Sequence, residues 1–219
     1  MRMCRLPLVA AFLVATLTAV SAQTPTPPPP SASGGQRPAG PPPGGPGGPG
    51  GQGRRGITVM SLTSTAWNDG GVIPVKYSQA GTEASPAFAW SEVPDGTMSF
   101  VLMMRDLDAA TGPGTEEILH WMLWNIPAAS RALPEGLPPA TQLPDGTRQI
   151  SATGPYYRGP GAAAAGPAHH YVFELYALDT TIEVPAVGQS PALTRAAVFA
   201  AMTGHVRAKG AYVGLFKRQ

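Results

Sequence analysis

The sequence predicts a mainly antiparallel β domain with little helix. Short apolar stretches with a two-residue alternation recur between residues 57 and 216, turn signals separate them, and one later segment has helical spacing. The residues that precede this region are instead rich in proline and glycine. We therefore expect one folded domain at residues 57–219, about 160 residues long, which is within the usual size of a domain.

The composition of the chain excludes several classes of partner and site. Its 219 residues carry a net charge of +2, with 13% charged residues, so it lacks the clustered basic surface that nucleic-acid binding needs. The single cysteine, Cys4, lies at the extreme N-terminus. The folded domain therefore has neither a disulfide framework nor a thiolate metal site or cysteine nucleophile.

The N-terminal residues have the pattern of an export signal. Arg2 and Arg5 precede an apolar run at residues 6–20, which ends in the small residues Ser21 and Ala22. The run of about 15 residues is shorter than the roughly 20 that span a membrane. We expect residues 1–22 to be a signal peptide cleaved after Ala22, and the mature protein to be periplasmic or secreted.

Residues 23–56 are dominated by proline and glycine and have almost no side chain that could enter a core. Such a segment cannot offset the entropy lost on ordering, so we expect a disordered tether. A proline-rich ligand for a partner domain is the alternative. The glycines interrupt any long polyproline helix and favour the tether.

The first strands of the domain are short. Alternating β-branched and polar residues at 57–63 predict a strand, and the sequence Asn-Asp-Gly-Gly at 68–71 predicts the turn that closes it. Further strands are expected at residues 72–74, 76–78 and 88–90, followed by a turn at 93–97 with proline and Asp-Gly in their usual places.

Two longer apolar strands within residues 99–127 form the centre of the predicted sheet. Asp106 and Asp108 end the first strand, and the period of two predicts that both carboxylates project to one face. His120 lies within the second strand, whose faces are both largely apolar, as in a sheet covered on both sides. His120 is thus a polar residue in an apolar strand.

The second half of the domain begins with a long irregular region at residues 128–166. A strand is then expected at 169–178, beginning with His169. Ser190 followed by Pro191 predicts a helix N-terminus, and apolar residues at helical spacing extend the helix over about 15 residues. Residues 211–216 alternate again and predict a final strand.

Asp106, Asp108, His120 and His169 could meet at one site, and several chemistries use such groups. They could bind a metal, but a tight pair such as His-x-x-x-His is absent. They could serve a metal-assisted or His/Asp-dependent hydrolase, but a Gly-x-Ser-x-Gly motif is also absent. Asp106 could simply cap a turn, with His120 a satisfied core residue. We favour a binding site without catalytic residues, metal or cofactor, in which protonated histidines donate to an anion and the aspartates accept from an ammonium group.

The order of the motifs resembles the phosphatidylethanolamine-binding protein family, and within it the bacterial Raf-kinase-inhibitor-like branch. The matching motifs cover nearly all of the domain and lie at residues 69–74, 85–90, 106–108, 120–127, 133–136, 157–160 and 169–173. This resemblance implies a large antiparallel sheet packed on a smaller sheet, with a short helix near the C-terminus. It also implies a non-catalytic pocket for a phosphate-like anion or a phospholipid head group. A protein target whose activity is modulated is the alternative partner.

The resemblance assigns seven residues to that pocket: Asp106, Asp108, His120, Gly159, Pro160, His169 and Tyr171. The chain differs from the family in two places. Residues 161–167 replace the usual proline pair with a longer alanine-rich loop, and His170 stands where arginine is common. In a regular strand His170 points to the face opposite His169 and Tyr171, so we leave it out of the pocket.

Overall fold

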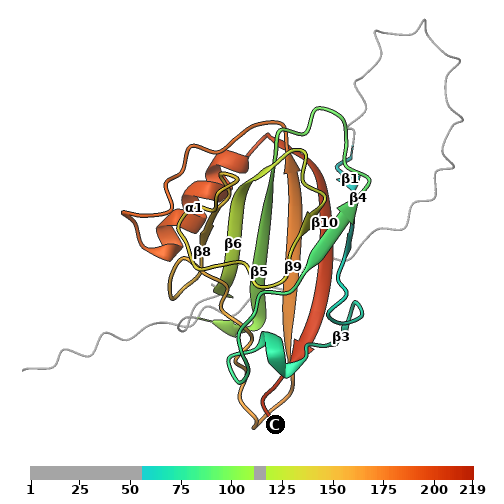
Figure 1. Ribbon diagram of the computed structural model, residues 1–219, viewed down its shortest axis with the longest axis vertical. Helices are drawn as coiled ribbons and strands as arrows, with labels where there is room; N and C mark the ends of the chain where they lie inside the picture. The colour runs from blue at the N-terminus through green and yellow to red at the C-terminus, as the bar shows by residue number, and fades with distance from the viewer. Residues whose placement is uncertain (1–55, 111–116) are drawn as a thin grey trace, which may run out of the picture. The chain divides into compact units, whose positions relative to one another are not determined.

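The computed structural model describes residues 56–110 and 117–219. The expected signal peptide, and the expected tether up to residue 55, lie outside the described residues. Figure 1 shows the described part as two β-sheets with one helix, α1 (Pro191–Met202), near the C-terminus of the chain.

The large sheet has seven strands, and four of them are long. Its order is β1-β10-β9-β5-β6-β8, and β3 also pairs with β10. The long central strands run antiparallel to their neighbours. The bounds of the large-sheet strands are β1 Thr58–Val59, β3 Gly71–Val72, β5 Ser99–Ala110, β6 Glu117–Pro127, β8 Arg148–Ile150, β9 His169–Leu178 and β10 Val206–Phe216.

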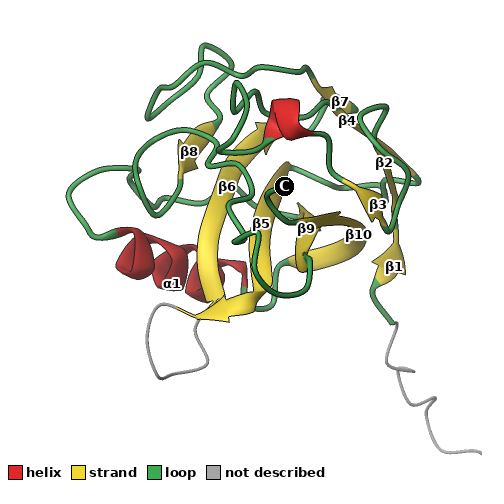
Figure 2. Cartoon of the chain, turned by 90° about the horizontal axis from the view of Figure 1, so that it is seen from below, coloured by secondary structure: helices red, strands yellow, loops and turns green. Residues whose placement is uncertain are grey.

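The small sheet has three strands in the order β2-β4-β7, with β2 at Ser61–Thr63, β4 at Phe88–Ser91 and β7 at Ala132–Leu133. Figure 2 shows the large sheet between this small sheet on one side and α1 on the other. Alternate residues of β5 therefore enter two separate cores. Leu102 packs in the core shared with the small sheet, and Val101 packs in the core shared with α1.

This arrangement confirms the predicted mainly β fold with both faces of the central strands covered. Three tryptophans of the strands, Trp90, Trp121 and Trp124, are buried in the cores. The helix is also confirmed, since the Ser190 hydroxyl accepts from Leu193 N–H at 3.3 Å. It has 12 residues, shorter than expected.

Three of the predicted strands differ in the structure. The strand predicted at 57–63 divides at Met60, whose N–H donates to Lys209 O, and its halves join different sheets. The strand predicted at 76–78 is wrong: a 3-10 turn, η1 (Val75–Tyr77), forms after Pro74 because Tyr77 N–H donates back to Pro74 O. The last strand begins at Val206, earlier than expected, because β10 pairs with β9 along its whole length.

Candidate functional site

The end of β5 positions Asp106. This residue is the last in β5 that pairs on both sides before the register shifts, with Ile118 of β6 and Tyr171 of β9. Its Oδ1 accepts a hydrogen bond from Asp108 N–H at 3.0 Å. This hydrogen bond between side chain and backbone forms a local turn within β5, at the point where the pairing with β6 changes register.

The two aspartates therefore bind different histidines. Asp108 has a side chain that is 41% exposed, and its Oδ2 accepts from the backbone N–H of His170 at 2.6 Å and lies 2.8 Å from His170 Nδ1. The backbone N–H and then the imidazole of His170 lower the pKa of Asp108. The period of two predicted that both carboxylates project to one face; in the structure a local turn at Asp106 gives them different partners.

Asp106 instead orients His169, the first residue of β9. The Nδ1 of His169 lies 2.9 Å from Asp106 Oδ2 and 3.1 Å from Oδ1. The side chain of His169 is 25% exposed, whereas that of Asp106 is almost fully buried. Nδ1 is occupied by the carboxylate, so Nε2 is the His169 nitrogen available to a ligand.

His120 approaches the same carboxylate from β6. Its Nδ1 lies 3.0 Å from Arg158 O, and because a carbonyl only accepts, Nδ1 carries the proton. Its Nε2 lies 4.0 Å from Asp106 Oδ2. Burial lowers the pKa of His120, against the opposing effect of its hydrogen bond to Arg158 O. Near neutral pH Nε2 is therefore an acceptor, and the expectation of a protonated His120 is not supported.

Tyr171 lies between the two imidazoles and is fully buried. The His120 ring meets it edge-on at 5.1 Å, and the His169 ring stacks on it at 6.5 Å. Its hydroxyl accepts from the N–H groups of Gly161 and Ala162, each at 3.2 Å. Burial, and then Asp106, raise the pKa of Tyr171, so its hydroxyl stays protonated.

Gly159 and Pro160 belong to a loop that is braced from a distant part of the chain. Gln79 donates from its side chain to Gly159 O at 2.8 Å and from its backbone to Pro160 O at 3.0 Å. Glu83 accepts from Gly159 N–H at 3.2 Å. Gly159 has no room for a side chain, since a Cβ there would lie 2.5 Å from Tyr77 O.

The structure thus brings together four of the predicted site residues, Asp106, His120, His169 and Tyr171, which we call the imidazole–aspartate cluster. The Gly159–Pro160 loop adjoins it through Arg158, and Asp108 pairs with His170 at its edge. The cluster lies at the end of the large sheet drawn lowest in Figure 1, where β9 begins and β10 ends. Sequence reasoning missed Gln79 and Glu83, which belong to no recognisable motif.

The described residues contain neither a candidate metal site nor a candidate membrane-spanning helix. Within 56–110 and 117–219, no group of three or more histidine, cysteine, aspartate or glutamate residues is placed to hold a metal ion. In the same part of the chain, no helix is both long and apolar enough to cross a membrane.

The fold agrees with a comparison to known families. The family model described as phosphatidylethanolamine-binding protein matches residues 63–217, which is more than half of the chain. The chain belongs to the phosphatidylethanolamine-binding protein family. This membership, which the order of the motifs predicted, supports a binding protein whose ligand is not specified.

Individual relatives extend this result. A UPF0098 protein of Methanothermobacter thermautotrophicus is 37% identical over 161 residues, which are 73% of this chain and 99% of that protein. The UPF0098 protein YbhB of Escherichia coli is 38% identical over 130 residues, covering 55% of this chain and 78% of YbhB. The crystal structure of E. coli YbcL, described as a member of the mammalian family, has a TM-score of 0.60 and 26% identity, covering 73% of this chain and 99% of YbcL. These relatives confirm the fold and the YbhB/YbcL-type branch.

Proposed function

We propose that this protein is a non-catalytic binding protein that takes a phosphate-like anion or a phospholipid head group at the imidazole–aspartate cluster. One observation carries the proposal. Asp106 Oδ2 and His120 Nε2 are two buried acceptors that face each other at 4.0 Å, which is too far for a hydrogen bond.

A ligand that brings a donor can bond to both acceptors. Asp106 Oδ2 already accepts from His169 Nδ1, whereas His120 Nε2 has no donor among the described residues, so a donor on the ligand adds one hydrogen bond at His120 and a further one at the charged Asp106. Two chemical groups of a head group fit this requirement: an ammonium, as in ethanolamine, and the P–OH of a singly ionised phosphate. A doubly ionised phosphate monoester has no P–OH donor, and its charge is repelled by Asp106.

The more exposed part of the cluster suits the oxygens of the ligand. His169 is held by Asp106 through Nδ1, so when the imidazole is protonated Nε2–H is free to donate to an oxyanion. The cluster therefore offers acceptors at its buried end and a donor at its partly exposed end. This arrangement suits a small polar ligand that carries a positive and a negative group.

The same geometry favours binding over nucleophilic catalysis. In the described part of the chain, neither His120 nor His169 is hydrogen-bonded to a serine or threonine hydroxyl. Tyr171, the nearby hydroxyl, has a raised pKa and is a poor nucleophile at neutral pH. We therefore expect no turnover of phosphomonoester, ester or peptide substrates above that of a His120→Ala, His169→Ala double variant. Metal-dependent turnover abolished by that variant would favour the hydrolase alternative.

Calorimetric titration with three ligands tests the proposal. Phosphoethanolamine should bind about tenfold more tightly than phosphocholine, because both carry phosphate but only the former has N–H donors, and a charged hydrogen bond contributes about 1.5–3 kcal/mol. If inorganic phosphate binds as well as phosphoethanolamine, P–OH supplies the donor, and its affinity should rise from about pH 8 to about pH 6 as the phosphate gains a proton. Wild-type affinity in a folded His120→Ala, His169→Ala double variant would overturn the proposal.

A further inference from the structure

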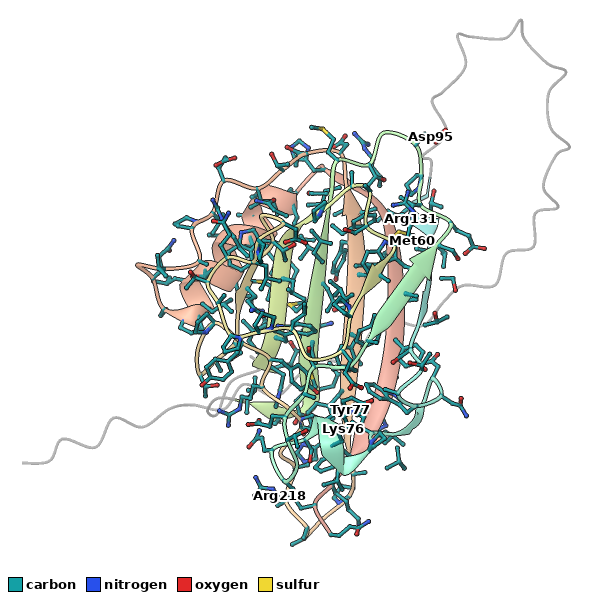
Figure 3. All side chains as sticks on the ribbon, viewed as in Figure 1. Met60, Lys76, Tyr77, Asp95, Arg131 and Arg218 are labelled. Atoms are coloured by element: carbon teal, nitrogen blue, oxygen red, sulfur yellow. The ribbon has the colours of Figure 1, made fainter. Side chains whose placement is uncertain are left out.

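A polar hollow lies near the cluster, and its lining carries a different charge. Its volume is about 300 Å³. It is lined by Gln79, Glu83, Thr153, Tyr156, Arg158 and Arg218. Figure 3 shows Arg218 at the same end of the structure as Tyr77, whose carbonyl accepts from the hydroxyl of Tyr157, the residue before Arg158.

The two arginines of this hollow lack the partners that arginines usually have. In residues 56–110 and 117–219, neither guanidinium has a carboxylate oxygen within 4.0 Å, although five other arginine and lysine residues do. Arg158 Nε is buried and has no hydrogen-bond acceptor. Arg218 reaches only the amide oxygen of Gln79, at 3.5 Å. Both arginines thus keep donor capacity for an acceptor that enters the hollow.

The backbones of both arginines are fixed. Arg158 N–H donates to His120 O at 3.0 Å, and Arg158 O accepts from His120 Nδ1. Arg218 N–H donates to Ala162 O at 3.0 Å. The guanidinium groups therefore project from positions held by the central sheet and by the loop at residues 159–162.

Glu83 supplies the opposing charge at the hollow. Its Oε1 is held by Gly159 N–H, and its carboxylate lies more than 4.0 Å from either guanidinium. Two arginines and one glutamate leave an excess of one positive charge on the lining. Planar guanidinium groups with several N–H donors match the oxygens of phosphate in geometry as well as charge.

We propose that Arg158 and Arg218 form an oxyanion site for inorganic phosphate or a phosphate monoester, separate from the imidazole–aspartate cluster. The sign of the charge separates the two sites. The cluster presents acceptors and one carboxylate at its buried end, whereas this site presents guanidinium donors.

Nuclear magnetic resonance of the arginine Nε–H groups tests the site with inorganic phosphate as the probe. The buried Nε–H of Arg158 should shift on titration. Arg158→Gln and Arg218→Gln should each weaken phosphate binding about tenfold, the loss expected for a charge-assisted hydrogen bond. Arg131→Gln is the matched control, because Arg131 also lacks a carboxylate partner but contacts only Ala128 O and Ser130 O. Figure 3 shows Arg131 at the opposite end from Arg218.

The Glu83→Gln variant should change phosphate affinity in the opposite direction from the two arginine variants. The amide oxygen can still accept from Gly159 N–H, so the loop keeps its brace while the lining loses its negative charge. Phosphate affinity should rise several-fold, an effect that a purely structural role of Glu83 would not produce.

Different results would overturn the arginine site and the proposed ligand site at the imidazole–aspartate cluster. If phosphate still shifts the Arg158 Nε–H signal in His169→Ala, the arginine site is separate from the cluster. If the shift is lost in this variant, the two sites are not separate. If Arg131→Gln, Arg158→Gln and Arg218→Gln weaken phosphate binding equally, phosphate is attracted to the positive surface in general, and the proposed arginine site is wrong. A comparison of phosphate with vesicles containing phosphatidylethanolamine distinguishes a free anion from a lipid head group as its source.

Discussion

His120 Nε2 lies 4.0 Å from Asp106 Oδ2, with the two side chains 3% and 4% exposed. His169 Nδ1 lies 2.9 Å from the same oxygen and bonds to it. One buried carboxylate thus orients one imidazole and faces the unprotonated nitrogen of another. This asymmetry separates a positioning role for His169 from an accepting role for His120.

Asp106 and Asp108 should differ sharply when each is changed to asparagine. Asp106→Asn keeps the shape but removes the charge that accepts the ligand's donor, so phosphoethanolamine affinity should fall about tenfold. Asp108→Asn is the matched control and should change affinity less than about twofold, since its carboxylate binds His170 at the exposed edge. Calorimetric titration measures both, and equal losses would place the ligand nearer to Asp108.

Acid should destabilise the protein through His120. Burial lowers its pKa in the folded state, so below about pH 6.5 the unfolded chain binds this proton more readily than the folded protein does. The free energy of unfolding then falls as pH decreases through and below that value. His120→Gln, which retains a donor for Arg158 O, should remove this part of the loss.

Urea unfolding of both proteins at about pH 7.5 and about pH 5 measures the difference, a range that brackets the ordinary histidine pKa. An identical loss of stability on acidification in wild type and His120→Gln would show that His120 does not carry this dependence.

Gly159→Ala should cost more stability than Gly161→Ala. At Gly159 the new Cβ meets backbone atoms of Tyr77 and Ser78, whereas at Gly161 it meets the end of the Gln79 side chain, which can move. The forced shift at Gly159 should cost about 1–3 kcal/mol. Urea denaturation provides the comparison, and the reverse order would contradict the bracing of this loop.

Much of the fold could be predicted from the sequence where elements are long and their signals local. The alternation in β5, β6 and β9 and the Ser190–Pro191 helix start are examples. The division at Met60, the parallel pairing of β1 and β3 with β10 and the short strands β7 and β8 depend on distant hydrogen bonds. No pattern within a few residues encodes those contacts.

The candidate site, too, could be predicted from the sequence only in part. The types of residue in the cluster could be predicted from the motif order. The direction of Asp108 could not, because one hydrogen bond from its N–H to Asp106 Oδ1 turns the chain. The neutral state of His120 follows from burial, and the bracing by Gln79 follows from a contact across 80 residues.

The proposed export signal can be checked independently of the site. We expect the intact mass of protein recovered from its native host to correspond to a chain beginning at Gln23. The physical reason is the short apolar run followed by small residues at 20–22. A chain recovered from the membrane fraction with Met1 retained would contradict both the cleavage and the periplasmic or secreted location.

A crystal structure of the protein with phosphoethanolamine tests the central claim most directly. We predict electron density at the imidazole–aspartate cluster with a donor atom of the ligand within about 3.2 Å of both Asp106 Oδ2 and His120 Nε2. Density for the ligand that contacts neither atom, at a concentration where calorimetry shows the site to be saturated, would contradict the account.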